Sequence, residues 1–284
     1  MMRILRRARP AVPVVRARVA TRLATLPPTW SAALLPTLLA MLTGCGTVGT
    51  EPGAVQALDF TAFPYPAVIT GDSLRDASGL VARLVATAYD VDGAAITDAP
   101  IRFISPDTGV TIDSLGRLRT TRRPGSLRVY ALVDGLQSAP RTLLVTAAPD
   151  TVLPTTGTTA TLAYTLPDVA GNVSADLTVA VRSLTDAAAP NVTGWLVQWR
   201  AIHGGDTIAL GDTTLAALQS SSGRRAALDT TSSGGTSTRR LRIFANRLPA
   251  PTDSFTVLAE VRRGGIAVPG SPVRFLVRAT PPTP

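Results

Sequence analysis

The chain has 284 residues, of which 45% are hydrophobic and 17% charged, and its formal net charge is +9. An excess of basic residues favours binding to nucleic acid, but here the excess is not spread along the chain. Residues 1–44 contain seven arginines and no acidic residue, which leaves 21 basic and 19 acidic residues in 45–284. The larger part of the chain is therefore nearly neutral, and we expect no nucleic-acid partner.

Residues 1–44 have the three parts of an export signal. A cationic stretch is followed by an apolar run from Trp30 to Leu42 and then by small residues. The apolar run is interrupted by Pro36 and is shorter than the ~20 residues that a helix needs to cross a bilayer. We therefore predict a signal peptide that directs export, and not a membrane anchor.

The predicted signal ends in Leu42-Thr43-Gly44-Cys45, which resembles the lipobox of bacterial lipoproteins. The resemblance implies cleavage before Cys45, lipidation of Cys45 with a fatty acid such as palmitate, and attachment to a membrane. Cys45 is the only cysteine, so an ordinary free thiol, which is the alternative, would have no disulfide partner within the chain. Gly46, and not Asp, follows the cysteine, and in lipoproteins of the enterobacterial type this resembles the signal for sorting to the outer membrane. We expect a lipid-anchored protein of the cell envelope, placed in the outer membrane.

The rest of the chain is expected to hold a tether, two domains and a tail. Residues 45–54 are small and polar, include Pro52, and are predicted to form a lipidated tether that spans only ~25–30 Å when extended. Residues 55–148 and 149–280 are predicted to form the domains, and residues 281–284 the tail. The first domain is therefore expected to stay close to its membrane.

Short apolar runs with a period of two, separated by Gly, Pro, Asp or Asn, are typical of strands with one buried face. In the first domain such runs cover 81–88, 101–103, 110–112, 127–133 and 143–145. No stretch between Leu58 and Val145 has an apolar period of 3.6 residues over a helical length. The sequence therefore predicts an all-β chain built from β-sandwiches.

The second domain repeats the pattern of the first. At an offset of 128 residues, 129–133 matches 257–261. At an offset of 96, five residues match, namely Val85 with Val181, Asp90 with Asp186, Ile96 with Val192, Ile101 with Val197, and Phe103 with Trp199. The increase in offset predicts a duplicated unit whose second copy carries an insertion of about 30 residues.

The predicted insertion, about 203–238, is rich in Gly, Ser and Thr and is expected to be a long loop. Within it, Leu215-Ala216-Ala217-Leu218 is compatible with one helical turn or with a short strand. Long loops in compact domains are more often functional or mobile than inert. We therefore expect a binding surface in this segment.

The motifs of the first copy are Asp90-Val91-Asp92-Gly93, Ile96 to Phe103, Val110 to Gly116 and Gly125 to Ala131. Together they resemble the bacterial immunoglobulin-like domains, group 2, of surface proteins. In the second copy, Ala189 stands for the turn glycine, Trp199 for the aromatic residue, and 229–235 for the Asp-x-x-Gly turn before the fifth strand. The resemblance implies two immunoglobulin-like β-sandwiches in tandem and a modular role at a cell surface. It implies no particular activity.

Gly71-Asp72-Ser73-Leu74 spells the nucleophile block of one family of lipases and esterases. A serine nucleophile needs a histidine oriented by a carboxylate, and the only histidine is His203. The family's aspartate falls on Arg200, its Gly-x-Asn-Asp block is absent from the sequence, and its fold is α/β. We therefore interpret Gly71 and Asp72 as a turn, with an ester hydrolase that uses Ser73 as a remote alternative.

Metal ligands and other chemical groups are sparse. Asp90, Asp92 and Asp98 resemble the first half of a calcium loop, but Ile101 occupies the twelfth position, where such a loop has Glu. We interpret this segment as a turn, with weak calcium binding as the alternative. His203 is expected to be an ordinary loop histidine, and we predict no catalytic residue, no metal site and no cofactor.

Arginine clusters and tryptophans complete the candidate binding residues. Trp199 is expected in the core, whereas Trp195 is expected to be exposed. The clusters are interpreted as solvated strand faces, with an anionic surface polysaccharide as the alternative ligand. Their members are Arg117, Arg119, Arg122 and Arg123 in the first domain and Arg239, Arg240 and Arg242 in the second.

The lipobox, the repeat and the lack of a catalytic set favour a non-enzymatic, lipid-anchored envelope protein. Its immunoglobulin-like domains are expected to act in binding, adhesion or spacing near the membrane. The expected partners are the membrane, through the lipid on Cys45, and a protein or polysaccharide of the cell surface. The alternative hypothesis is an accessory subunit of an outer-membrane machine for export or polysaccharide assembly, with the insertion as its docking surface.

Overall fold

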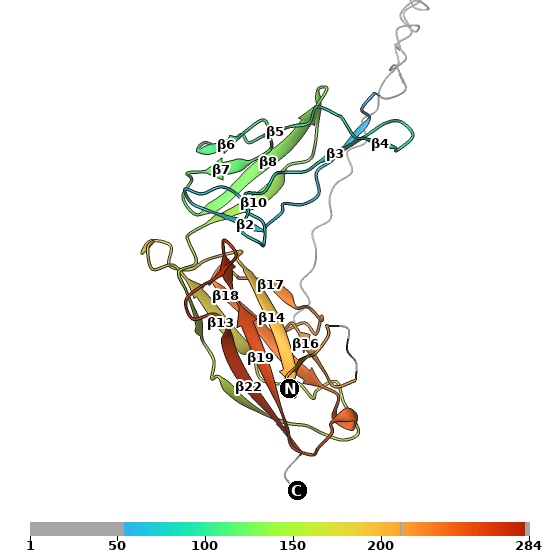
Figure 1. Cartoon of the computed structure of the whole chain (residues 1–284), viewed down its shortest axis with the longest axis vertical. Helices are drawn as coiled ribbons and strands as arrows, with labels where there is room; N and C mark the ends of the chain where they lie inside the picture. The colour runs from blue at the N-terminus through green and yellow to red at the C-terminus, as the bar shows by residue number, and fades with distance from the viewer. Residues whose placement is uncertain (1–53, 211, 213, 282–284) are drawn as a thin grey trace, which may run out of the picture. The chain divides into compact units, whose positions relative to one another are not determined.

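The computed structural model describes residues 54–210, 212 and 214–281 (Figure 1). The predicted signal peptide, Cys45 and nearly all of the tether lie outside the described residues. The described residues belong to one compact unit. Its described residues form β-strands and one short 3₁₀ turn, Ala245–Arg247, which confirms the all-β fold class. No helix in this part of the chain is long and apolar enough to cross a membrane.

The first sandwich consists of ten strands that pair only with one another. One sheet has the order β2-β10-β8-β5 with β9 beside β8, a second has the order β1-β3-β4, and β6 pairs with β7. The bounds are β1 (Ala57–Asp59), β2 (Ala67–Ile69), β3 (Thr87–Tyr89), β4 (Ala95–Ile96), β5 (Arg102–Ile104), β6 (Val110–Ile112), β7 (Leu118–Thr120), β8 (Gly125–Val133), β9 (Leu136–Gln137) and β10 (Arg141–Thr146).

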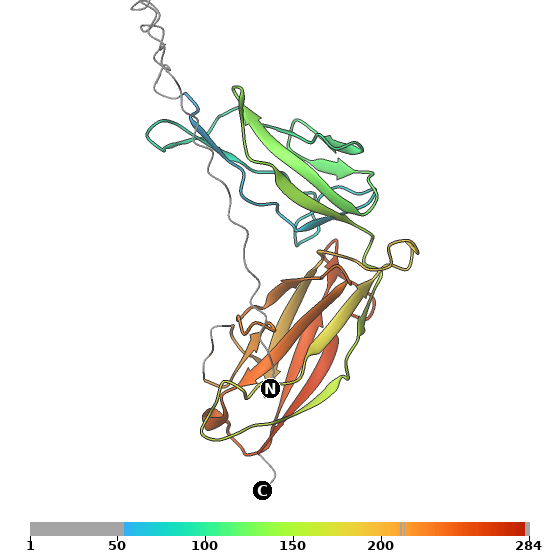
Figure 2. The ribbon, with the colours of Figure 1, turned by 180° about the vertical axis from the view of Figure 1, so that it is seen from behind.

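The second sandwich, which runs from yellow-green to red in Figure 2, has two main sheets. Their strand orders are β11-β13-β18-β16 and β12-β22-β19-β14-β15, with β17 also paired to β14. A separate hairpin is formed by β20 and β21. The bounds are β11 (Thr151–Pro154), β12 (Thr159–Ala163), β13 (Leu177–Arg182), β14 (Leu196–His203), β15 (Asp206–Thr207), β16 (Ala216–Gln219), β17 (Leu228–Thr230), β18 (Thr236–Ile243), β19 (Asp253–Glu260), β20 (Arg262–Arg263), β21 (Ile266–Ala267) and β22 (Val273–Thr280).

Both sandwiches are closed in the same way, by a parallel pair between an early strand and the last strand. In the first, β2 lies parallel to β10, and in the second, β12 lies parallel to β22. The other strand pairs are antiparallel. This arrangement makes each sandwich immunoglobulin-like, as the sequence predicts.

Alternation along the strands places the core between the two sheets of each sandwich. In β8, the apolar side chains of Leu127, Val129 and Ala131 are fully buried, while Arg128 between them is exposed. Strands β19 and β22 bury alternate residues in the same manner, including Phe255 and Phe275. The period-two pattern that identifies these strands in the sequence is therefore the pattern that fills the core.

The register of the strands supports the internal repeat. Phe103 in β5 lies opposite Ala131 in β8, and Trp199 in β14 lies opposite Ala259 in β19. These are the residues that match at offsets of 96 and 128 in the sequence. An aromatic residue opposite an alanine therefore occupies the same place in both sandwiches.

The match of Val85 with Val181 is wrong, because Val85 is 70% exposed and Val181 is fully buried. The amide of Leu84 donates to the carbonyl oxygen of Gly116, and the amide of Val181 donates to that of Gly235. Leu84, which is buried, is therefore the counterpart of Val181, one position away from the residue that the ungapped match selects.

The expected turn over 229–235 is also corrected. In the first sandwich the amide of Gly116 bonds the carbonyl of Asp113, and in the second the amide of Gly235 bonds the carbonyl of Ser232. Ser232 therefore stands where the first copy has Asp113, and its hydroxyl accepts from the amide of Thr236. Asp229 is not part of this turn, and its hydrogen bonds are described below.

The segment expected to be an inserted loop forms three short strands. The Leu215-Ala216-Ala217-Leu218 segment lies largely within β16, which pairs with β18, whereas β15 and β17 pair with β14. The inserted residues therefore extend both sheets of the sandwich. Gly235 corresponds to Gly116 at an offset of 119, so part of the insertion lies after Gly235, in the connection that holds the 3₁₀ turn.

Gly235 is predicted to tolerate no side chain, because its φ is +70° and a Cβ would lie 2.8 Å from the carbonyl oxygen of Val181. Gly223 is a matched control, since its φ is +81° and a Cβ there would meet open space. We expect Gly235→Ala to lower the free energy of unfolding by about 3 kcal/mol and Gly223→Ala by about 1 kcal/mol. Urea denaturation measures both, and equal losses would contradict the close backbone packing.

Candidate functional site

The two sandwiches meet in a packed joint within the compact unit. Strand β10 ends at Thr146 and β11 begins at Thr151, so the connection is short. The amide of Thr193 donates to Oγ1 of Thr146 at 3.1 Å. The rings of Tyr65 and Trp195 lie with their centroids 5.0 Å apart and are both buried. The expectation that Trp195 is exposed is therefore wrong, because the first sandwich covers it.

Backbone contacts at the joint leave no room for side chains. The turn of the β20–β21 hairpin contains Gly264 and Gly265. A Cβ on Gly79 would overlap the carbonyl carbon of Gly264, and a Cβ on Gly265 would overlap the carbonyl oxygen of Ser78. The glycines thus allow the two turns to touch backbone to backbone, which fixes the hairpin of one sandwich against the other.

A cleft of about 580 Å³ opens beside this joint. Its lining includes Asp72, Ser73 and Arg75 from the first sandwich and Gln198, Glu260 and Arg262 from the second. Arginine guanidinium groups lie against its carboxylates, with distances of 3.1 Å for Arg75 and Asp72 and 2.6 Å for Arg262 and Glu260. The cleft therefore contains ion pairs from both sandwiches.

The same pairing disfavours acid–base or cation chemistry in the cleft. Burial raises the pKa of Asp72, but hydrogen bonds from Arg75 and from the amide of Ser73 outweigh it and lower that pKa below its usual value. Asp72 therefore stays ionised and held by its partners at neutral pH. Among the described residues no group of three or more His, Cys, Asp or Glu side chains is placed to hold a metal ion.

The geometry gives no support to the ester hydrolase. Ser73 lines the cleft together with Leu196 at the start of β14, whereas His203 is at the end of that strand. Seven residue steps at ~3.3 Å separate those strand ends by ~23 Å, so His203 cannot take a proton from Ser73. His203 instead lies 2.8 Å from an Oδ of Asp253. Gly71, with φ of +82°, and Asp72, whose amide bonds the carbonyl of Ile69, form the expected turn.

Asp90 caps a turn, as expected. Its Oδ1 accepts hydrogen bonds from the amides of Asp92 and Ala94, at 3.0 and 2.8 Å. Asp186 in the second copy accepts from the amides of Ala188 and Ala189 in a similar way. The repeated aspartates are thus explained by backbone capping.

The arginine cluster of β18 is only partly a solvated face. Arg240 pairs with Asp176, and Arg242 lies 2.6 Å from Asp168, while Leu241 and Ile243 face the core as expected. Arg239, however, is only 4% exposed and points between the sheets. Because Arg240 and Arg242 are close by, Arg239 reads in the sequence as one more member of a solvated cluster. Its spacing of two and four residues from the buried Leu241 and Ile243 is the signal that could have identified it as buried.

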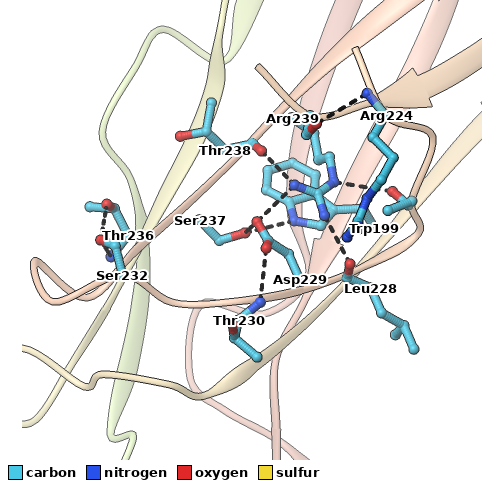
Figure 3. Close-up of polar contacts among 12 residues, drawn as sticks. Trp199, Arg224, Leu228, Asp229, Thr230, Ser232, Thr236, Ser237, Thr238 and Arg239 are labelled. Carbon is cyan, nitrogen blue, oxygen red and sulfur yellow. Dashed lines mark hydrogen bonds and ion pairs between the residues drawn. The ribbon is translucent and has the colours of Figure 1, made fainter. Parts of the chain in front are cut away.

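The Arg239 guanidinium lies at the centre of a buried polar network (Figure 3). Nη1 donates to Oδ2 of Asp229 at 2.8 Å, Nη2 to the carbonyl of Leu228 at 2.8 Å, and Nε to the carbonyl of Ala226 at 3.1 Å. The network therefore ties the inserted strand β17 to β18.

The network continues from Asp229 into the core. Ser237 donates its hydroxyl to Oδ2 of Asp229 at 2.8 Å, and Nε1 of Trp199 donates to the Ser237 oxygen at 3.0 Å. The indole of Trp199 is stacked on Phe275, with ring centroids 6.1 Å apart. The inserted residues are thus anchored to the central tryptophan of the sandwich, and this part of the insertion is structural.

Comparisons with known proteins give weak similarities. No family model matches the chain, and no curated protein matches it. Domains 4 and 5 of the S-layer protein SbsC are 15% identical, with 80% of this chain and 98% of that one covered and a TM-score of 0.29. The adhesin InvE of Yersinia pseudotuberculosis is 16% identical, with coverages of 68% and 52% and a TM-score of 0.31.

The D0-D1 domain of intimin is 15% identical, with 69% of this chain and 88% of that one covered and a TM-score of 0.27. These solved structures are of surface-layer and adhesin proteins. At such TM-scores the similarity carries no conclusion about the function of this chain, which has to come from its own residues.

Replacement of Arg239 by leucine is expected to destabilise the second sandwich. The change leaves the Asp229 carboxylate and the carbonyls of Ala226 and Leu228 without their partner, and loss of one member of a buried ion pair costs about 3–5 kcal/mol. Arg240→Leu is the matched control, because Arg240 is a solvated neighbour on the same strand and should have little effect. Chemical denaturation of both variants tests this, and a loss in Arg239→Leu no larger than in Arg240→Leu would refute it.

Proposed function

We propose that this chain is a non-enzymatic, lipid-anchored protein of the bacterial cell envelope whose two sandwiches act as one binding and spacing module. The observation that carries the proposal is the packed joint, at which Tyr65 of one sandwich is buried against Trp195 of the other. Independent modules on a flexible linker would need neither the buried ring pair nor the backbone contact between Gly79 and Gly264.

The cleft beside the joint supports a role in binding. It needs residues from both sandwiches, so its shape depends on their fixed relation. The described lining contains no histidine, and the nearest carboxylate, Asp72, is held by Arg75 and by the amide of Ser73, which favours recognition over catalysis. We further propose that the domains divide near residue 148, since the strands before and after this point pair in separate sheets.

The lipid anchor is the second part of the proposal and rests on the lipobox at Cys45. A short tether fixes the distance of the first sandwich from the membrane. A rigid joint between the sandwiches then also fixes the distance of the second sandwich from the membrane. The envelope location, the outer membrane and a surface partner belong to the same proposal.

Coupling through the joint is tested by Tyr65→Ala. The change removes a buried ring, which typically costs about 3–5 kcal/mol, and removes it from the surface that joins the sandwiches. Calorimetry is expected to show one coupled transition for the wild type and two separate transitions for Tyr65→Ala. Leu184→Ala, at a residue that is 75% exposed, is the control. A single, unshifted transition in Tyr65→Ala would show that the joint does not couple the sandwiches.

The anchor is tested by metabolic labelling with an alkyne-bearing fatty acid in a bacterial host. The wild type and a Thr47→Ser control are expected to carry the label and to enter the detergent phase. Cys45→Ser is expected to carry none, because no other cysteine is present to accept the lipid. Equal labelling of Cys45→Ser would remove the lipid anchor from the proposal.

A further inference from the structure

Three exposed arginines form a surface on the first sandwich, which we call the arginine face: Arg83, Arg117 and Arg119. Leu118 and Thr120 of β7 are buried, so alternation directs Arg117 and Arg119 to the solvent. Arg83 forms an antiparallel bridge with Arg117, next to the buried Leu84. All three side chains therefore leave the same side of the sheet.

The arginine face is an unfavourable arrangement for the protein alone. Residues directly opposite in an antiparallel pair have Cβ atoms only about 5 Å apart, and like charges at such positions destabilise the sheet. Within the described part of the chain, none of the ion pairs includes Arg83, Arg117 or Arg119. By contrast, nearby Arg75 pairs with Asp72, and Arg122 with Asp107.

The acidic residue closest in sequence, Asp113, is already engaged by the backbone. Its Oδ1 accepts hydrogen bonds from the amides of Leu115 and Arg117, at 2.9 and 2.8 Å. The guanidinium groups of the arginine face thus keep their donors available for a partner outside the chain.

The spacing of these groups suits phosphate. Arg83 and Arg117 lie about 5 Å apart at Cβ, and Arg119 is two residues further along β7, about 7 Å from Arg117. Guanidinium groups bind phosphate oxygens through paired hydrogen bonds. The hydroxyl of Thr111, across from Arg119, donates to the carbonyl oxygen of Arg119, so the donors of this face are the guanidinium groups. A plane of phosphate groups would therefore be matched by several donors at once.

We propose that the arginine face binds the phosphate headgroups of an anionic lipid membrane. All three arginines are exposed and lie on two adjacent segments joined by the Arg83–Arg117 bridge, which fits a layer of headgroups better than an enclosed small anion. The proposal rests on the proposed lipid anchor, whose tether of ~25–30 Å would hold the first sandwich within reach of the headgroups. Contact with the headgroups would then set the orientation of the sandwich on the membrane.

The test uses a chain that begins at residue 45 and carries Cys45→Ser, so that it has neither the basic residues 1–44 nor a lipid of its own. Sedimentation with vesicles of equimolar phosphatidylglycerol and phosphatidylcholine measures binding, and pure phosphatidylcholine vesicles give the background. We expect binding to the anionic vesicles that weakens as salt is added. The triple change Arg83→Gln, Arg117→Gln and Arg119→Gln is expected to reduce the partition coefficient by roughly 100-fold, since each arginine near an anionic surface contributes about fivefold.

The matched control changes three exposed arginines of the second sandwich, Arg224→Gln, Arg274→Gln and Arg278→Gln, and alters net charge by the same amount. It is expected to bind as the parent chain does, and thermal unfolding confirms that both triple variants remain folded. Equal loss in the two variants would overturn the proposal, because net charge alone would then explain binding.

A second result would also overturn it. If the parent chain does not sediment with the anionic vesicles but does bind the acidic polysaccharide polygalacturonate, the face recognises a different polyanion. Neither outcome touches the fatty-acid labelling of Cys45, since the vesicle experiment contains no lipidated protein. The anchor and the arginine face can therefore fail separately.

Discussion

The antiparallel pairing of β14 with β19 positions the core of the second sandwich, the aromatic contact at the joint and the His203–Asp253 pair. In its middle, Trp199 lies opposite Ala259 and fills the core of the second sandwich. Just before β14, Trp195 packs on Tyr65 at the joint, and at the end of the strand His203 meets Asp253. Because the strand is rigid and extended, the cleft and the histidine are held apart. The same pairing therefore creates the joint and removes the histidine from it.

Buried polar contacts specify how the inserted strands pack on this frame. The described sandwiches contain no cysteine, so packing and hydrogen bonds alone join their sheets. A buried ion pair such as Arg239 with Asp229 adds little net stability compared with apolar residues of similar size. The contribution of this ion pair is to specify geometry. The guanidinium also donates to the carbonyls of Ala226 and Leu228 and so fixes the position of β17.

The fold was largely predictable because alternation of apolar residues reports directly on burial. That signal identified β8, β10 and the aromatic residues Phe103 and Trp199, which occupy corresponding positions in the two sandwiches. It could not assign the register of Val85, since an ungapped match ignores the one-residue shift. The site was predictable only in part, because the burial of Trp195 comes from the neighbouring sandwich and that of Arg239 from strands paired through the insertion. Both depend on contacts between residues far apart in the sequence.

Net charge was the least informative property of this chain, because it averages over arginines in very different settings. Those of 1–44 belong to the predicted signal, Arg239 is buried against a carboxylate, and Arg75, Arg240 and Arg262 have acidic partners. Of the 21 arginines in the described residues, nine pair with an acidic residue. Three of the other twelve, Arg83, Arg117 and Arg119, lie together on one sheet face. A nearly neutral protein can thus present a locally cationic surface, and strand register decides where that surface forms.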